Sequence, residues 1–164
     1  MKYTLLEATD RDGDFIFRLR AVTLKEYVEQ IWGWDDAYQE ARFFGKFDPT
    51  EWQIIVSNDQ DVGALQVWRE ETEVILGNIQ IAPQYQDRGL GSAVIRDILA
   101  EARGDGLPVT LWVLRGNPAR RLYERLGFTV VEETPLRYKM RALGRHYQAP
   151  FDCCREEDQA GYPA

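Results

Sequence analysis

Apolar residues recur at two different spacings along this chain, and the spacing predicts which segments form helices and which form strands. Over residues 90–102 they recur every three or four positions, the period of a helix that buries one face, and Gly104 is expected to end that helix. The same spacing predicts a long helix over residues 14–31, capped near Asp12, and a second helix over residues 34–44.

Shorter runs rich in β-branched and aromatic residues predict strands, because such side chains suit a pleated, partly buried surface. Three of these runs follow one another closely, separated by short polar turns, so they are expected to form an antiparallel meander. The predicted strands cover residues 3–8, 52–57, 62–69, 74–81, 109–114, 128–132 and 136–140.

A glycine-containing turn joins the strand that ends before Pro83 to the helix that starts near residue 90. Its sequence is Gln-Asp-Arg-Gly-Leu-Gly-Ser, residues 86–92. Gly89 and Gly91 lack a Cβ atom, so consecutive main-chain amides can approach an anion, and the positive end of the following helix points to the same place. The turn therefore predicts a pyrophosphate site. The alternative is a turn that only lets the helix pack against the strand.

Two other phosphate-binding motifs fit this turn poorly. The P-loop has Lys and then Ser or Thr after its last glycine, whereas Gly91 is followed by Ser92 and Ala93. The dinucleotide-binding fingerprint needs a small residue where Val94 stands. Neither of these two folds is therefore predicted.

A second motif occupies residues 117–128 and has the features of a short helix with defined ends. Asn117 is expected to cap the helix, Pro118 suits its first position, and Gly127 follows its end. Tyr123 lies within this helix. Taken alone, Tyr123 is either a packed aromatic residue or a catalytic one.

Together the two motifs resemble those of the GCN5-related N-acetyltransferase (GNAT) family, whose members use acetyl-coenzyme A (acetyl-CoA). The family's phosphate-loop pattern, Gln/Arg-x-x-Gly-x-Gly/Ala, is matched by Gln86, Gly89 and Gly91. Its later segment is an Asn that opens a helix carrying a Tyr and closing on Gly-Phe, and it is matched by Asn117, Tyr123, Gly127 and Phe128.

The resemblance spans residues 3–142 and implies an α/β fold of the GNAT type. Such a fold has a mixed, largely antiparallel central sheet of about six to seven strands flanked by about four helices. Its fourth and fifth strands splay apart and leave a cleft for the pantetheine arm. One acetyltransferase domain is therefore expected over residues 1–142, followed by a tail of unassigned role over residues 143–164.

The resemblance also implies catalytic roles. Tyr123 is expected to act as the general acid that donates a proton or hydrogen bond to the departing coenzyme A (CoA) sulfur. Glu73, at or before the start of the fourth strand, is a candidate general base. Some family members carry a Glu deeper in that strand, where this chain has Ile75, Leu76 and Gly77. Alternatives lie in the acceptor-side helices, where each carboxylate otherwise belongs to a solvated face: Glu26, Glu29, Asp35 and Asp36.

The same comparison implies a set of cofactor-binding residues. A main-chain amide near Ile79 or Ile81 is expected to polarise the acetyl carbonyl. Three arginines farther along the chain either contact the ribose phosphate or are ordinary surface residues: Arg115, Arg120 and Arg121. The full cofactor-binding set is expected to be Ile79, Ile81, Gln86, Asp87, Arg88, Gly89, Leu90, Gly91, Ser92, Asn117 and Tyr123.

The acceptor side is expected in the first two helices and the loop between them, as in the family. Aromatic and acidic side chains cluster there and can form a cage that attracts a cation. In the alternative, the tryptophans pack the helices onto the sheet and each carboxylate belongs to a solvated face. The candidate substrate-binding residues are Glu29, Trp32, Trp34 and Asp35, with Tyr38 and Asp36 beside them.

Composition limits the classes of partner. The net charge of −7 and a pI near 4.8 argue against nonspecific binding to nucleic acid or to anionic membranes, and they favour a cationic acceptor. No apolar leader or membrane span is visible, so a cytoplasmic protein is predicted. Cys153 and Cys154 are adjacent and the chain has a single His, so neither a disulfide framework nor a metal site is expected.

The sequence therefore predicts an N-acetyltransferase that moves the acetyl group of acetyl-CoA directly to a primary amine of a small molecule or a peptide, without an acyl-enzyme. The alternative from another class is a noncatalytic acyl-CoA-binding sensor or regulatory module. A different acyl donor would use the same phosphate turn. Dimerisation, common in the family, is a further expectation.

Overall fold

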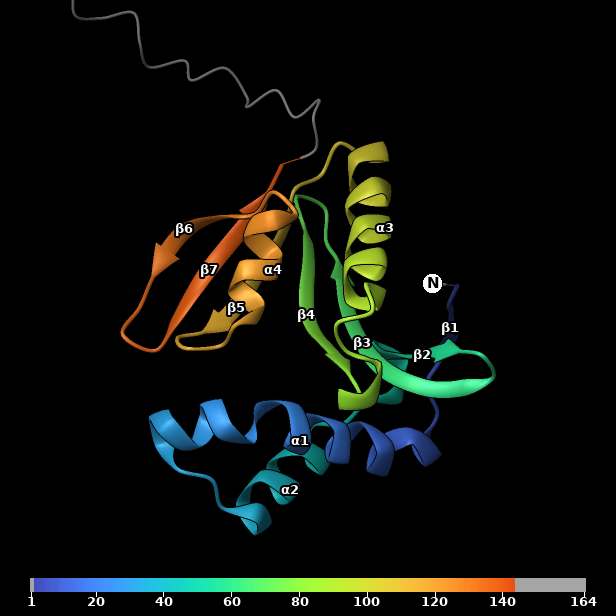
Figure 1. Ribbon diagram of the computed structural model, residues 1–164, viewed down its shortest axis with the longest axis vertical. Helices are drawn as coiled ribbons and strands as arrows, with labels where there is room; N and C mark the ends of the chain where they lie inside the picture. Colours follow the sequence, from blue (N-terminus) through green and yellow to red (C-terminus); the bar gives the residue numbers. More distant parts are fainter. Residues whose placement is uncertain (1, 144–164) are drawn as a thin grey trace, which may run out of the picture.

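The computed structural model describes residues 2–143, which form one seven-stranded sheet flanked by four helices (Figure 1). The strands lie in the order β1-β2-β3-β4-β5-β7-β6. Their bounds are β1 (Thr4–Glu7), β2 (Trp52–Ser57), β3 (Gln60–Arg69), β4 (Val74–Ile81), β5 (Val109–Leu114), β6 (Thr129–Glu133) and β7 (Arg137–Ala142). The helices are α1 (Gly13–Trp32), α2 (Asp36–Phe44), α3 (Leu90–Gly104) and α4 (Ala119–Arg125).

The predicted fold class is confirmed. The sheet is mixed but largely antiparallel, since β4 and β5 form its one parallel pair within the described residues. Every predicted helix and strand is present, with ends within a few residues of those expected. α2 begins at Asp36, two residues later than predicted, because the Asp35 side chain accepts a hydrogen bond from the Tyr38 amide at 2.6 Å and caps the helix there.

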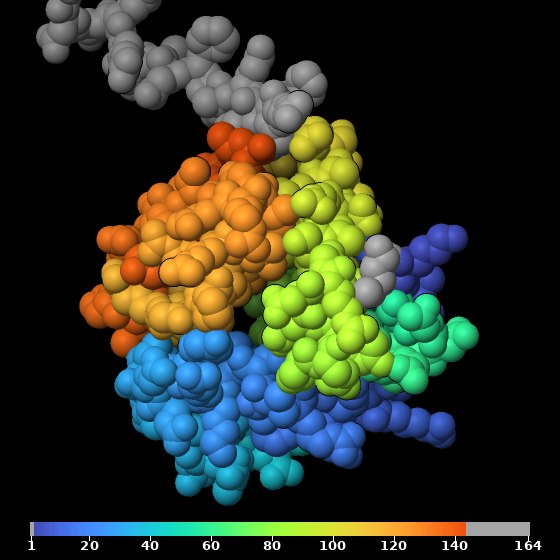
Figure 2. Space-filling model, viewed as in Figure 1, coloured from blue at the N-terminus to red at the C-terminus, as the bar shows by residue number. Residues whose placement is uncertain are grey.

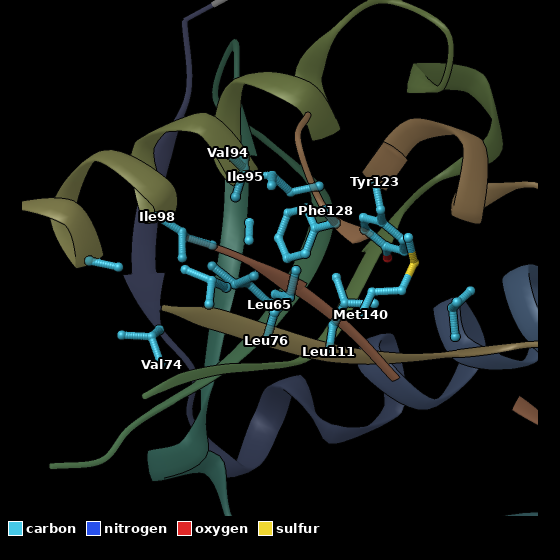
Figure 3. Packing of buried hydrophobic residues seen from close by; sticks show 14 of the residues in the cluster. Leu65, Val74, Leu76, Val94, Ile95, Ile98, Leu111, Tyr123, Phe128 and Met140 are labelled. Atoms are coloured by element: carbon cyan, nitrogen blue, oxygen red, sulfur yellow. The ribbon is translucent and has the colours of Figure 1, made fainter. Parts of the chain in front are cut away.

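Helices cover both faces of the sheet, and the alternation of side chains along each strand divides them between two cores. In β2, Ile54 joins the core under α1, whereas Ile55 joins the core under α3 and α4. Leu65 and Ala64 in β3 divide in the same way. Figure 3 shows the larger core, in which Phe128 packs beside α3.

Aromatic side chains hold α2 in place, although none of its residues is fully buried. Phe43 and Phe44 contact rings from α1 and from the segment before β2, with ring centroids 5.1–6.5 Å apart. Tilted and edge-to-face pairs of this kind are favourable. This cluster fixes both helices against one end of the sheet, with α1 and α2 together on one side of it (Figure 1).

β4 and β5 run side by side only at their starts. Their pairing stops at Leu76 and Leu111, and no later residue of β4 pairs with β5. Gly77 sits in a bulge, because Leu76 pairs with Val67 and Asn78 with Gln66, which leaves Gly77 without a partner residue in β3. The two strands therefore diverge beyond Gly77, as the splayed strands of the predicted fold require.

The boundary expected at residues 142 and 143 falls at the edge of the described residues, and it stays a prediction. Cys153 and Cys154 lie outside the described residues. No helix among residues 2–143 combines the length and the apolar character needed to span a bilayer.

Candidate active site

A groove of about 2050 Å³ begins where β4 and β5 diverge. Its walls come from α1 and α2 on one side and from β5, α4 and the turn before α3 on the other. Figure 2 shows the hollow between the blue residues of α1, the orange residues of α4 and the lime residues of the turn. Both sequence motifs therefore border the same space.

The glycine turn has the geometry of an anion site. Gly89 is the residue before α3 and has φ of 80°, a left-handed conformation that suits a residue without Cβ. Asp87 is also left-handed, with φ of 58°. Gln86 closes the turn from the other side, since its Nε2 donates to the Ile81 carbonyl oxygen at 2.8 Å. The main-chain amides at the start of α3 border the groove through Gly89, Leu90, Gly91 and Ser92.

Gly91 argues against a turn built only for packing. A Cβ atom added there would meet its nearest protein atoms, on Ile81 and Leu122, at 3.9 Å, an ordinary van der Waals distance. The protein itself therefore has room for a side chain at Gly91. The free space lies on the groove side, where a ligand can approach the backbone.

Tyr123 is buried in α4, with 8% of its surface exposed, and it still borders the groove. Its ring packs edge-to-face against Phe128, with centroids 5.8 Å apart (Figure 3). Burial raises the pKa of Tyr123 to about 12, so its hydroxyl keeps its proton at neutral pH. Tyr123 therefore packs in the core and also borders the groove.

Asn117 starts the α4 segment as expected. Its Oδ1 accepts a hydrogen bond from the Ala119 amide at 2.9 Å, and Pro118 has helical dihedral angles just before the helix. Asn117 also borders the groove. Opposite it, Ile79 and Ile81 border the groove from the part of β4 that has no β5 partner.

Arg88 differs from the rest of the predicted cofactor set because it does not border the groove. Its guanidinium lies over the Tyr85 ring, 5.8 Å from the centroid. Of the other arginines, Arg115 and Arg120 stack on the Tyr138 ring at 4.3 and 4.2 Å. Arg125, at the end of α4, borders the groove and was not singled out in the sequence.

Glu73 is not brought together with Tyr123. It lies at the opposite end of β4 from the groove, where its carboxylate accepts a hydrogen bond from the Thr110 hydroxyl at 2.7 Å. Ile79 is six positions farther along the chain, about 20 Å away in an extended strand. Deeper in β4, the space above Gly77 is filled by Trp68, whose ring would lie 2.3 Å from an added Cβ atom. A carboxylate side chain therefore has no room at Gly77.

The predicted acceptor residues are placed partly as expected. Trp32, Trp34 and Asp35 border the groove together with Tyr38, whereas Glu29 is exposed and lies outside it. Neither tryptophan belongs to a core cluster, and Trp32 is 60% exposed, so packing of both onto the sheet is not what the structure shows.

The acidic half of the predicted cage is engaged elsewhere. Asp35 caps α2, and Asp36 accepts a hydrogen bond from Trp34 Nε1 at 2.8 Å. Asp36 also lies 3.8 Å from the Lys25 ammonium and does not border the groove. The aromatic residues face the groove without a ring of free carboxylates around them.

Sequence reasoning missed a polar network on the floor of the groove. Arg20 Nη1 donates to Asn78 Oδ1 at 2.5 Å, and Asn78 Nδ2 donates to Gln66 Oε1 at 2.5 Å. Gln66 in turn donates to a Glu51 carboxylate oxygen at 3.0 Å. The available signal was the pair Asn78 and Gln80, polar residues at alternate positions in an otherwise apolar strand.

Comparison with known proteins assigns the family. Residues 48–130, about half of the chain, match the model of the acetyltransferase (GNAT) domain. The chain is also 31% identical over 101 residues to the [ribosomal protein bS18]-alanine N-acetyltransferase of Haemophilus influenzae, covering 60% of this chain and 68% of that one. The chain belongs to the GNAT family. It is an N-acetyltransferase by this membership, so the resemblance seen in its two motifs is confirmed.

Solved structures share the fold of this GNAT protein at low sequence identity. The PaiA N-acetyltransferase from Thermoplasma acidophilum, in complex with coenzyme A, superposes with a TM-score of 0.70 at 14% identity, covering 87% of this chain and 99% of that one. The ribosomal-protein-S18-alanine N-acetyltransferase from Escherichia coli gives a TM-score of 0.59 at 21% identity, covering 92% and 98%.

Proposed function

We propose that this GNAT protein transfers the acetyl group of acetyl-CoA directly to the α-amine of an amino acid or peptide. One observation supports the proposal above the others: the glycine turn and Tyr123 border a single groove. A solved GNAT neighbour holds coenzyme A, and a relative acts on an alanine of a ribosomal protein. The first supports the choice of donor and the second the class of acceptor.

The turn and β4 would hold the donor. The amides at positions 89–92 face an anion, so they suit the diphosphate. The part of β4 beyond Gly77 has no β5 partner, so its main-chain groups are available to the pantetheine arm and to the acetyl carbonyl. The thioester then lies near Ile79 and Tyr123.

Tyr123 would assist the departure of the thiol. The amine nitrogen attacks the thioester carbon, and the tetrahedral intermediate collapses as the carbon–sulfur bond breaks. The sulfur takes a proton from the Tyr123 hydroxyl, which regains one from the nitrogen through solvent. The hydroxyl makes no hydrogen bond to another described residue, so it is available to the sulfur.

β4 places no carboxylate in the groove, and this favours an α-amine over a lysine side chain as the acceptor. The α-amine of a peptide N-terminus, with a pKa of about 7.7–8.0, is neutral in roughly one molecule in ten at pH 7, whereas a lysine amine, with a pKa of ~10.4, is neutral in about one in 2,500. A lysine therefore requires a strong base in the site. β4 offers no carboxylate to the groove, and Glu73 is remote from it.

An amine panel tests this proposal against the noncatalytic module. Release of CoA thiol from acetyl-CoA is followed with N-terminal peptides, amino acids and Nα-blocked lysine as acceptors, and CoA binding is measured by calorimetry. We expect turnover with free α-amines and little with Nα-blocked lysine. Tight CoA binding without turnover on any amine would instead establish the binding module.

A further inference from the structure

We propose that the acceptor carries a carboxylate close to its amine, and that Arg20 binds this carboxylate with Arg42 beside it. The inference rests on the proposed function and names the acceptor more closely. It replaces the expectation of a cationic acceptor, which came from the net charge of the whole chain. The chain as a whole is acidic, whereas this part of the groove contains the cationic side chains of Arg20, Arg42 and Lys46.

Arg20 is fixed in place on the floor of the groove. It lies on the groove face of α1, and its guanidinium sits over the rings of Phe43 and Trp52, 5.7 and 5.9 Å from their centroids. Asn78 accepts the hydrogen bond from Nη1. A guanidinium carries five N–H donors, so an edge remains available to a planar anion.

No protein carboxylate neutralises Arg20. Three cationic side chains border the groove: Arg20, Arg42 and Lys46. Among residues 2–143, none of them has a carboxylate within salt-bridge distance. Burial, with Arg42 nearby, lowers the pKa of Arg20 from its ordinary value, which indicates an unpaired cation facing another cation. A bound anion would relieve both the burial and the repulsion.

The two carboxylates that border the groove serve other purposes. Asp35 caps α2 through the Tyr38 amide, and Asp87 belongs to the left-handed turn before α3. The rest of this part of the floor is polar and uncharged, from Gln66, Asn78 and Gln80. Among the described residues, no free carboxylate in the groove faces Arg20 and Arg42, and a ligand carboxylate would supply that charge.

Gln80 supplies a place for the amine. Its side chain is buried, with 5% exposed, and its Oε1 accepts no hydrogen bond from the described residues. A buried acceptor of this kind costs about 1–3 kcal/mol if left unpaired, so an N–H donor from a ligand fits it. Gln80 and Asn78 are two residues apart on one face of β4, about 6–7 Å.

That spacing sets the geometry of the acceptor. An amine at Gln80 and a carboxylate at Arg20, beside Asn78, are a few ångströms apart. Two sources provide this arrangement: the α-carboxylate of a free amino acid, and the side chain of an N-terminal Asp or Glu in a peptide. Both place the amine near Ile79, where the thioester is proposed to lie.

Matched acceptors test the inference. One arm compares peptides that begin with Asp and with Asn, and a second compares a free amino acid with its amide; kcat/KM is measured for each. We expect the acid to be preferred over its neutral isostere by about ten- to a hundredfold in at least one arm, and that arm identifies the source.

Two variants and a control attribute the preference to the groove floor. Arg20→Gln should reduce the acid-to-amide ratio about tenfold or more, and the exposed Arg42→Gln should reduce it in the same direction if Arg20→Gln does not fold. Arg18→Gln, an exposed residue of α1 outside the groove, should leave the ratio unchanged. Comparing the acid-to-amide ratio of each variant with that of the wild type cancels the difference in amine pKa between the two acceptors, because that difference is the same for every protein.

The outcomes separate this inference from the proposed function. Turnover with equal kcat/KM for acid and amide overturns only the carboxylate site. An acid preference that survives both Arg20→Gln and Arg42→Gln overturns its location. Absence of acetyl transfer to every amine overturns the proposed function and, with it, this inference.

Discussion

Tyr123 shows how one side chain can serve the core and the chemistry together. Its ring packs on Phe128, and the residue also borders the groove. Because burial raises its pKa, the phenol remains a proton donor across the neutral range. Removing only the hydroxyl oxygen therefore separates the two roles.

Replacement of Tyr123 by Phe should lower kcat by about tenfold to a few hundredfold, because a thiolate with a pKa of ~8.5 is already a tolerable leaving group. The KM for acetyl-CoA should change little. Steady-state kinetics measures both. Tyr138→Phe is the matched control, since Tyr138 lies outside the groove; a Tyr123→Phe enzyme as fast as the wild type would exclude the proposed acid.

The same residue predicts a loss of stability in alkali. The pKa of Tyr123 is raised to about 12 from 10.0, so between these pH values the unfolded chain releases a proton that the folded chain retains. Stability from this group is therefore complete below about pH 10 and falls as pH rises toward 12.

Urea denaturation near pH 9 and near pH 11 measures the effect. The free energy of unfolding should fall by about 1 kcal/mol less in Tyr123→Phe than in the wild type over this interval. Contributions from other groups, including Tyr3, are present in both proteins and cancel. Parallel pH dependences in the two proteins would contradict the assigned burial.

At the scale of the elements, the proposed donor site is formed by the turn and the start of α3. This site contains two glycines, Gly89 and Gly91, and the structural requirement differs between them. Gly89 needs a left-handed conformation, whereas Gly91 has no such requirement and has room for a Cβ atom on the protein side. The second glycine borders the groove, and we propose that a small residue, Gly or Ala in the family pattern, is needed there for a ligand to approach the backbone.

Gly91→Ala should leave stability unchanged or raise it by up to about 1 kcal/mol, since Ala suits a helix better than Gly. Its KM for acetyl-CoA should change little, because the family pattern admits Ala at this position, whereas the branched side chain of Gly91→Val should raise that KM about tenfold by occupying the approach to the amides. Gly89→Ala should instead lower stability by about 1–2 kcal/mol.

Thermal unfolding and steady-state kinetics distinguish these substitutions. Gly104→Ala, at the far end of α3 with no protein atom within 4 Å of an added Cβ, controls for the helix propensity alone. An unchanged KM for acetyl-CoA in Gly91→Val would show that ligand approach does not require a small residue at this position.

At the scale of the whole molecule, the features that could be predicted from the sequence are those that depend on local geometry. Periodicity placed the helices and strands, and the turn at Gly89 and the start of α4 at Asn117 were both recognisable, because backbone conformation and capping act within a few residues. Glu73 and Arg20 depend on which parts of distant elements meet, which spacing along the chain does not encode. Only the bulge at Gly77 and the position of α1 over β4 placed Arg20 beside Asn78 and left Glu73 remote.

Net charge illustrates the same limit. The chain carries −7 overall, yet Arg20, Arg42 and Lys46 gather in the groove. A sum over the sequence describes the surface as a whole and does not determine the charge of one cavity.

The central claim is that the backbone at positions 89–92 binds the diphosphate of acetyl-CoA, and a crystal structure of this protein with CoA tests it most directly. We predict diphosphate oxygens within about 3.2 Å of those amide nitrogens and the CoA sulfur beside the Tyr123 hydroxyl. A diphosphate bound away from the turn, or a thiol directed away from Tyr123, would contradict the account.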